Sequence, residues 1–307
     1  MSPYFNVYVA VDWSASRNPG PVKPKKDALW MAWEDASGAR SVAYFRTRES
    51  LMEALAERCR AWLAEKQRIL AGFDFAFGYP AGFAAAAQLP GGGAPWERTW
   101  AYLEEAFRTT DDRFSVADAL NARCGELTYG PFWGLAGGKG DREHLARKRT
   151  GFNYPYPLGD GRHLQRLRHT DAATKGVQEV WKLAGIGSVG SQALTGIAHL
   201  EQFRKRPALR EFSVVWPLET GFALPEPEGP RLVIAEIFPS PAPQLPEEPD
   251  AAGQAEIRDR RQVRSLVAHL KNLDQRGDLK PRFGAPAAYS DVQITECVAE
   301  EAAILPI

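Results

Sequence analysis

Cysteine and histidine are both scarce in this 307-residue chain, which limits the kinds of site that it can build. The three cysteines, Cys59, Cys124 and Cys297, are far apart and no Cys-x-x-Cys pair occurs, so a disulfide framework or a zinc–thiolate site is not expected. The five histidines show no His-Glu-x-x-His spacing. We therefore interpret the histidines as surface or structural residues.

An excess of charge of one sign and a long apolar run are also missing. The chain has 38 basic and 38 acidic residues, so a nucleic-acid surface would have to be a local basic patch. No segment reaches the roughly 18 apolar residues of a membrane span, and residues 1–6 lack the features of a signal peptide. We expect a cytoplasmic protein that makes no membrane contact. The oligomeric state does not follow from the sequence.

The pattern of apolar residues, which make up 44% of the chain, predicts an α/β fold. Three strands form an antiparallel meander, and a helical crossover then places a fourth strand parallel to the first. We expect a core of residues 1–94 and 211–307, with a mainly helical insertion over 95–210. The predicted strands are 5–13, 28–34, 41–46, 68–74, 212–216 and 231–237, and the clearest predicted helices are 49–66, 96–108, 178–206, 255–273 and 290–305.

Three carboxylates occupy equivalent places in this pattern. Asp12, Asp74 and Glu236 each follow an apolar run and precede a sharp break in the chain. The ends of adjacent parallel strands lie about 5 Å apart, so the two Asp carboxylates would repel each other. A bound Mg²⁺ or Mn²⁺ would remove that conflict, because these cations prefer oxygen ligands. The alternative is that each acid caps a loop or pairs with a nearby arginine.

The order of elements and acids resembles the ribonuclease-H-like superfamily. More narrowly, the motifs at 11–15 (Val-Asp-Trp-Ser-Ala), 72–80 (Gly-Phe-Asp-Phe-Ala-Phe-Gly-Tyr-Pro) and 236–239 (Glu-Ile-Phe-Pro) resemble the DUF429-type predicted nucleases. The motifs at 131–134 and 181–192 resemble those of a bacterial subgroup of this family. Members of that subgroup are sometimes labelled molybdopterin or cobalamin biosynthesis proteins. The resemblance covers most of the chain.

This resemblance implies a mixed five-stranded sheet with flanking helices and a long helical insertion between strands four and five. It also implies that Asp12, Asp74 and Glu236 are metal ligands. A fourth acid is expected on the last helix, where Glu300 and Glu301 are our choice, although the family's usual Asp-Ala pair is absent there.

Two short segments carry candidate substrate-binding groups. The glycine-rich turn at 185–191 leads into a helix and offers Ser188, Ser191 and Gln192 as donors to a phosphate. Close helix packing explains the same glycines, and neither the dinucleotide nor the P-loop fingerprint is met. Ser14 and Ser16 follow Asp12 in a turn that loosely resembles the phosphate-binding turn of actin-like ATPases.

Basic residues cluster at 142–149, 162–168 and 258–264, with aromatic residues at 152, 154 and 156. Within the first cluster, Arg147, Lys148 and Arg149 are our candidates for contacts to phosphates of DNA or RNA. A solvated charged face is the alternative interpretation.

These observations favour a metal-dependent phosphodiesterase that acts on nucleic acid. A phosphotransferase of the actin-like type is a weaker hypothesis, because those proteins need two copies of the core and one is found here. A non-catalytic nucleic-acid-binding or accessory protein is the third hypothesis.

Overall fold

The computed structural model of the chain describes residues 3–125, 127–226, 228–229, 231–239, 242–249 and 253–307, and it divides into two compact units. The first, here called the sheet unit, comprises residues 1–75, 203–287 and 304–307. The second, the helical unit, comprises residues 76–202 and 288–303. The sequence placed the ends of the insertion at 95 and 210, whereas these units divide at residues 75/76, 202/203, 287/288 and 303/304. Residues 288–303, which the sequence assigned to the core, therefore belong to the helical unit.

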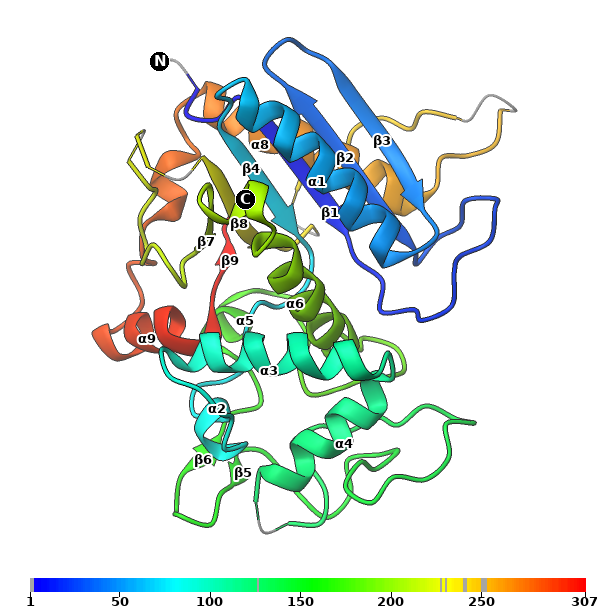
Figure 1. Ribbon diagram of the computed structural model, residues 1–307, viewed down its shortest axis with the longest axis vertical. Helices are drawn as coiled ribbons and strands as arrows, with labels where there is room; N and C mark the ends of the chain where they lie inside the picture. The colour runs from blue at the N-terminus through cyan, green and yellow to red at the C-terminus, as the bar shows by residue number, and fades with distance from the viewer. Residues whose placement is uncertain (1–2, 126, 227, 230, 240–241, 250–252) are drawn as a thin grey trace. The chain divides into compact units, whose positions relative to one another are not determined.

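The sheet unit contains a mixed sheet of seven strands in the order β3-β2-β1-β4-β8-β7, with β9 also paired to β8 (Figure 1). The first three strands are antiparallel neighbours, and β4 lies parallel to β1 as the crossover predicts. The expected number of five strands was too low. One edge of β8 pairs with β7 and then, further along, with β9, so two strands join the five-stranded core. The strand predicted at 212–216 is β7, whereas β9 lies where the sequence indicated the end of a helix. The strands are β1 (Val7–Asp12), β2 (Leu29–Asp35), β3 (Arg40–Phe45), β4 (Ile69–Phe73), β7 (Ser213–Trp216), β8 (Leu232–Ile237) and β9 (Ile304–Leu305).

Two long helices cover opposite faces of this sheet (Figure 1). Helix α1 (Arg48–Ala64) begins at Thr47, whose side chain accepts the N–H of Ser50, and it packs Trp62 against Trp33 with ring centroids 5.4 Å apart. Helix α8 (Arg258–Gln275) covers the other face, where the hydroxyl of Tyr8 donates to Asp274 at 2.7 Å. Alternate residues of β1 therefore face α8, and Asp12 lies on the same face as Tyr8. Helix α7 (Pro207–Arg210) and the 3₁₀ turn η1 (Lys280–Phe283) complete the unit.

The helical unit is built around a cluster of aromatic rings. Four fully buried rings meet in tilted or edge-to-face pairs with centroids 4.7 to 5.8 Å apart: Tyr79, Phe83, Phe132 and Trp181. The elements of this unit are α2 (Phe83–Ala86), α3 (Pro95–Thr109), α4 (Arg113–Arg123), α5 (His169–Ala173), α9 (Asp291–Glu296), the π-helical turn η2 (Cys297–Glu301) and the small hairpin β5 (Tyr156–Pro157) and β6 (His163–Leu164). Helix α6 (Gly190–Arg204) begins in this unit.

Two predicted helices are shorter than the sequence indicated. The helix expected over 178–206 begins only at Gly190, because Gly185 and Gly187 adopt positive φ angles in a preceding loop. The helix expected over 290–305 ends at Glu301, because Ala302 has a φ of 59° and the chain continues into β9. Its start is confirmed, since Ser290 and Gln293 form the predicted capping box. A membrane-spanning helix needs about 20 mostly apolar residues, and none of the helices among the described residues meets that requirement.

Candidate functional site

Asp12 and Asp74 lie side by side at the ends of two parallel strands. Val11 is in register with Phe73, so the next residues along β1 and β4 are the two aspartates. The backbone N–H of Trp13 donates to Asp74 at 2.7 Å, and the N–H of Asp74 donates to the carbonyl of Val11 at 3.2 Å. These bonds fix both carboxyl groups at the same edge of the sheet, as the sequence predicted.

The two carboxyl groups cannot easily both be ionised. Burial, the neighbouring Asp74 and the more distant Asp259 raise the pKa of Asp12 well above its ordinary value. Burial also raises the pKa of Asp74 to about 7, against the opposing effect of the hydrogen bond from Trp13. The two side chains are hydrogen-bonded to each other, which requires one of them to carry a proton. Among the described residues, neither aspartate forms an ion pair with a lysine or arginine that would relieve the repulsion.

Asp259 is a third acid near this pair, and the sequence interpretation missed it. It occupies the first turn of α8, accepts the N–H of Asp27 at 2.5 Å, and is also hydrogen-bonded by the N–H of Ala28. Its negative charge raises the pKa values of both Asp12 and Asp74. The sequence shows it only within the basic run Arg258-Asp-Arg-Arg, where its single charge is inconspicuous. Only the packing of α8 on the sheet brings it to the aspartate pair.

Glu236 is not brought to the pair by the register of the sheet. It lies opposite Phe73 on the neighbouring strand, so Ile237 is the residue in register with Asp74. Successive residues of a strand face opposite sides of the sheet. The side chain of Ile237 lies over Gly72, two residues before Asp74, which places Ile237 on the face of the aspartates. Glu236, which is buried, therefore belongs to the other face.

The Asp12–Asp74 pair suits a hydrated hard cation. Both residues are partly accessible to solvent, so an ion that keeps water ligands can reach them. Mg²⁺ is usually bound through one or two carboxylates and retains several waters, which is what this pair offers. Within the described ranges, no three histidine, cysteine, aspartate or glutamate side chains are grouped so that they could hold one ion together. A cation here would have Asp12 and Asp74 as its direct ligands and Asp259 as a nearby negative charge.

Glu300 and Glu301 hold two short helices of the helical unit in place. The carboxylate of Glu300 accepts the N–H groups of Gly82 and Ala84, each at 2.6 Å. The carboxylate of Glu301 accepts those of Ala81 at 2.9 Å and His169 at 2.6 Å. These N–H groups begin α2 and α5, where an anion is favoured by the helix dipole. Both glutamates therefore stabilise the backbone where α2 and α5 begin.

Burial changes the protonation of these glutamates. It raises the pKa of Glu300 to about 7, with the neighbouring Glu301 adding to the shift. It also raises the pKa of Glu301, against the opposing effects of the hydrogen bonds from His169 and Ala81. Both carboxyl groups therefore titrate at higher pH than exposed glutamates do.

The serines proposed as phosphate donors mostly make local hydrogen bonds. Ser14 accepts the N–H of Ser16 at 3.4 Å, and the hydroxyl of Ser16 donates to the carbonyl of Asn18. Ser191 is buried and donates to the carbonyl of Leu183 at 2.7 Å, while Ser188 and Gln192 are half-buried.

Close packing accounts for the glycine at the start of α6. A Cβ atom at Gly190 would lie only 2.3 Å from the carbonyl oxygen of Val180. The backbone of this turn is therefore pressed against the preceding segment. Of the two explanations that the sequence left open, close helix packing is supported at this position.

The basic clusters differ in how far their charges are already neutralised. In the cluster at 162–168, Arg162 pairs with Asp160, Arg166 with Glu179, and the buried Arg168 with Asp171. In the cluster at 258–264, three arginines pair with Glu247, Glu248 and Glu256.

The segment from Arg147 to Arg149, within the cluster at 142–149, is the most solvent-exposed part of the three clusters. All three side chains are exposed. Arg147 has a 3.4 Å ion pair with the exposed Asp141, and Arg149 lies over the ring of Tyr154 at 5.6 Å. Arg147, Lys148 and Arg149 therefore remain the best-placed candidates for contacts to phosphates.

In comparisons with known proteins, no family model, no curated protein and no solved structure matches the chain.

Proposed function

We propose that this protein is a divalent-cation-dependent phosphodiesterase that cleaves nucleic acid, with its cation bound at Asp12 and Asp74. The observation that carries the proposal is the pair itself. Two carboxyl groups stand in register at the ends of parallel strands, hydrogen-bonded to each other and without a basic partner among the described residues. A protein that needed these positions only for stability would be better served by neutral or oppositely charged side chains.

The arrangement of strands supports the same proposal. The order β3-β2-β1-β4-β8, with β2 antiparallel to the others, is the order expected of a ribonuclease-H-like sheet. In that resemblance the carboxyl ends of the first and fourth strands carry metal-binding acids, and Asp12 and Asp74 occupy those positions.

Each acid has a distinct task in this proposal. Asp12 and Asp74 must lose their shared proton to hold Mg²⁺ or Mn²⁺, so cation affinity increases as the pH rises through about 7. The N–H of Trp13 holds the Asp74 carboxylate in position. Asp259 strengthens the negative potential that attracts the cation. A bound cation would supply a nucleophilic water at neutral pH and stabilise the leaving oxygen.

Nucleic acid is the proposed substrate because the exposed segment from Arg147 to Arg149 combines cationic side chains with the nearby ring of Tyr154. Cations and aromatic rings are the groups that bind phosphates and unstacked bases.

A nuclease assay with matched aspartate variants tests the proposal. Single- and double-stranded DNA and RNA are incubated with wild type, Asp12→Asn, Asp74→Asn and the control Asp278→Asn, each with Mg²⁺, with Mn²⁺ or with EDTA. Asp278 is an exposed aspartate of the same unit. The proposal requires cation-dependent cleavage in wild type and D278N that D12N and D74N lose by at least about a hundredfold. Cleavage that persists in D12N and D74N, or no cleavage of any of the four substrates, would contradict it.

A further inference from the structure

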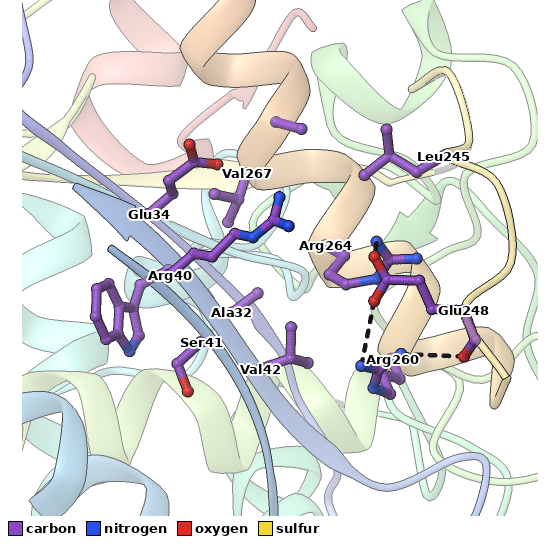
Figure 2. Close-up of a pocket in the computed structure, with 12 residues that line it drawn as sticks. Ala32, Glu34, Arg40, Ser41, Val42, Leu245, Glu248, Arg260, Arg264 and Val267 are labelled. Carbon is purple, nitrogen blue, oxygen red and sulfur yellow. Dashed lines mark hydrogen bonds and ion pairs between the residues drawn. The ribbon is translucent and has the colours of Figure 1, made fainter. Parts of the chain in front are cut away.

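The sheet unit contains a second concave site, distinct from the aspartate pair in its lining residues. A cavity of about 200 Å³ lies between strands β2 and β3, helix α8 and the segment 242–249, here called the strap (Figure 2). The residues that line it do not include Asp12, Asp74 or Asp259.

The walls of this cavity combine apolar side chains with charged and polar ones. Ala32 and Val42 contribute from the sheet, Val267 and Ala268 from α8, and Leu245 from the strap. An apolar cavity of about 150 Å³ is large enough for benzene. The volume here therefore suits a small molecule whose apolar part is about the size of one six-membered ring.

Two arginines at one end of the cavity are held rigidly by the glutamates beside them. Arg264 pairs with Glu248 at 2.7 Å and with Glu256 at 2.9 Å, and Arg260 pairs with the same two residues. The side chain of Glu256 is fully buried. Burial alone would raise the pKa of this carboxyl group, but Arg264 and Arg260 lower it, and the pKa lies below its ordinary value. These ion pairs hold the strap on α8. Because the two positive and two negative charges neutralise one another, the network does not itself attract an anion.

Arg40 is the charged lining residue whose guanidinium has no carboxylate partner among the described residues. It stands directly opposite Glu34 in the β2–β3 ladder, but Glu34 is paired with Lys271 at 2.5 Å. Figure 2 shows the Arg40 side chain extended along the cavity towards Val267, with its guanidinium group away from Glu248. A guanidinium at the edge of a cavity with apolar side chains can bind an anionic group through two parallel hydrogen bonds.

We propose that this cavity binds a small molecule with one anionic group, a carboxylate or a phosphate, and an apolar body of about the size of a benzene ring. Arg40 binds the anionic group, and the surfaces of Val42, Val267 and Ala268 contact the apolar body. The site is independent of the proposed phosphodiesterase activity, since it rests on residues that the activity does not use.

Titration calorimetry with three probes tests this site. Benzoate carries the carboxylate, phenyl phosphate the phosphate, and benzamide is the neutral isostere. The variants are Arg40→Gln, Ala268→Phe, which fills the cavity, and the control Arg210→Gln, an exposed arginine of α7. Because Arg40 is itself exposed, its replacement leaves the core intact. Circular dichroism verifies that every variant is folded.

The expected result is saturable one-to-one binding of benzoate or phenyl phosphate, with the better of the two identifying the anionic group. R40Q should weaken that binding by about tenfold or more, because it removes a charge-assisted hydrogen bond. A268F should abolish it, and R210Q should leave it unchanged. The proposal is overturned if neither anion binds at millimolar concentration and low salt, if benzamide binds as tightly as the anions, or if R40Q and R210Q have equal effects.

Discussion

The carboxyl groups of Asp12 and Asp74 are hydrogen-bonded to each other across the ends of two parallel strands, with the N–H of Trp13 donating to Asp74 at 2.7 Å. This relationship couples the protonation of the site to the stability of the fold. Folding raises the pKa values of both groups, so the folded state binds protons more tightly than the unfolded chain does.

Without divalent cations, the stabilising effect of this pair should decrease as the pH rises. For Asp74 the effect is fully present below about pH 4, the ordinary pKa of an aspartate, and is lost as the pH rises through about 7. Asp12, whose pKa is also raised, adds an effect of the same sign. Asp12→Asn removes the titrating group, so in EDTA the variant should gain roughly 1 to 3 kcal/mol relative to wild type between pH 5 and pH 8. Urea unfolding of both proteins at a series of pH values measures this difference. A constant difference across the series would contradict the coupling.

Added Mg²⁺ or Mn²⁺ should reverse that order. A ligand that binds only the folded state stabilises it by mass action, by about 2.7 kcal/mol at a hundred times its dissociation constant. The melting temperature of wild type should therefore rise with cation concentration at pH 8, and much less in D12N and D74N. D278N serves as the control and should follow wild type. Equal shifts in wild type and D12N would exclude a cation site at the pair.

Removing the charge of Asp259 should lower the pKa of Asp12. Asp259 raises that pKa through charge repulsion, and Asp259→Asn retains an oxygen that can accept one of the two backbone N–H bonds. Carbon-13 NMR titration of the aspartate carboxyl groups follows the effect directly. The midpoint of Asp12 should move to lower pH in D259N and stay unchanged in D278N. No movement in D259N would mean that Asp259 is not part of the electrostatic environment of the site.

Glu300 should matter for stability rather than for cation binding. Glu300→Ala leaves the N–H groups of Gly82 and Ala84 without their acceptor, at a cost of roughly 2 to 4 kcal/mol. Glu300→Gln keeps an acceptor and should cost less, while removing a carboxyl group whose pKa is raised to about 7. Urea unfolding measures both variants, and the thermal shift with Mg²⁺ should be the same as in wild type. A stable E300A that no longer responds to Mg²⁺ would instead assign Glu300 to the cation site.

Charge reversal at Arg147, Lys148 and Arg149 should weaken nucleic-acid binding. Each lost phosphate contact lowers the slope of log affinity against log salt by about one. Binding is measured across a salt series with Ca²⁺ in place of Mg²⁺ to suppress cleavage, and reversal of the exposed Arg60 and Arg210 is the control. If both sets of reversals reduce affinity equally, the segment at 147–149 has no special role. No binding of any nucleic acid at low salt would exclude nucleic acid as the substrate.

Local sequence determined the first four strands and the aspartate pair. The apolar runs before Asp12 and Asp74 are strongly patterned, and a helical crossover between them fixes both their parallel direction and the edge at which they end. The capping signal at Ser290 was equally local and is confirmed. Such features depend on neighbours within a few residues, so the sequence alone is sufficient to predict them.

Only the tertiary structure decided which other groups belong with the pair. Glu236 has the same sequence context as the aspartates, but a register that pairs it with Phe73 turns it to the other face, and one residue of register decides the face. Asp259 has no distinctive local signal, yet α8 crosses the sheet so that its first turn reaches the pair. Some partners of the basic runs lie outside the runs themselves, such as Glu248 of the strap beside Arg264. Register and helix packing depend on residues far apart in the chain, and their outcome is therefore set by the folded structure.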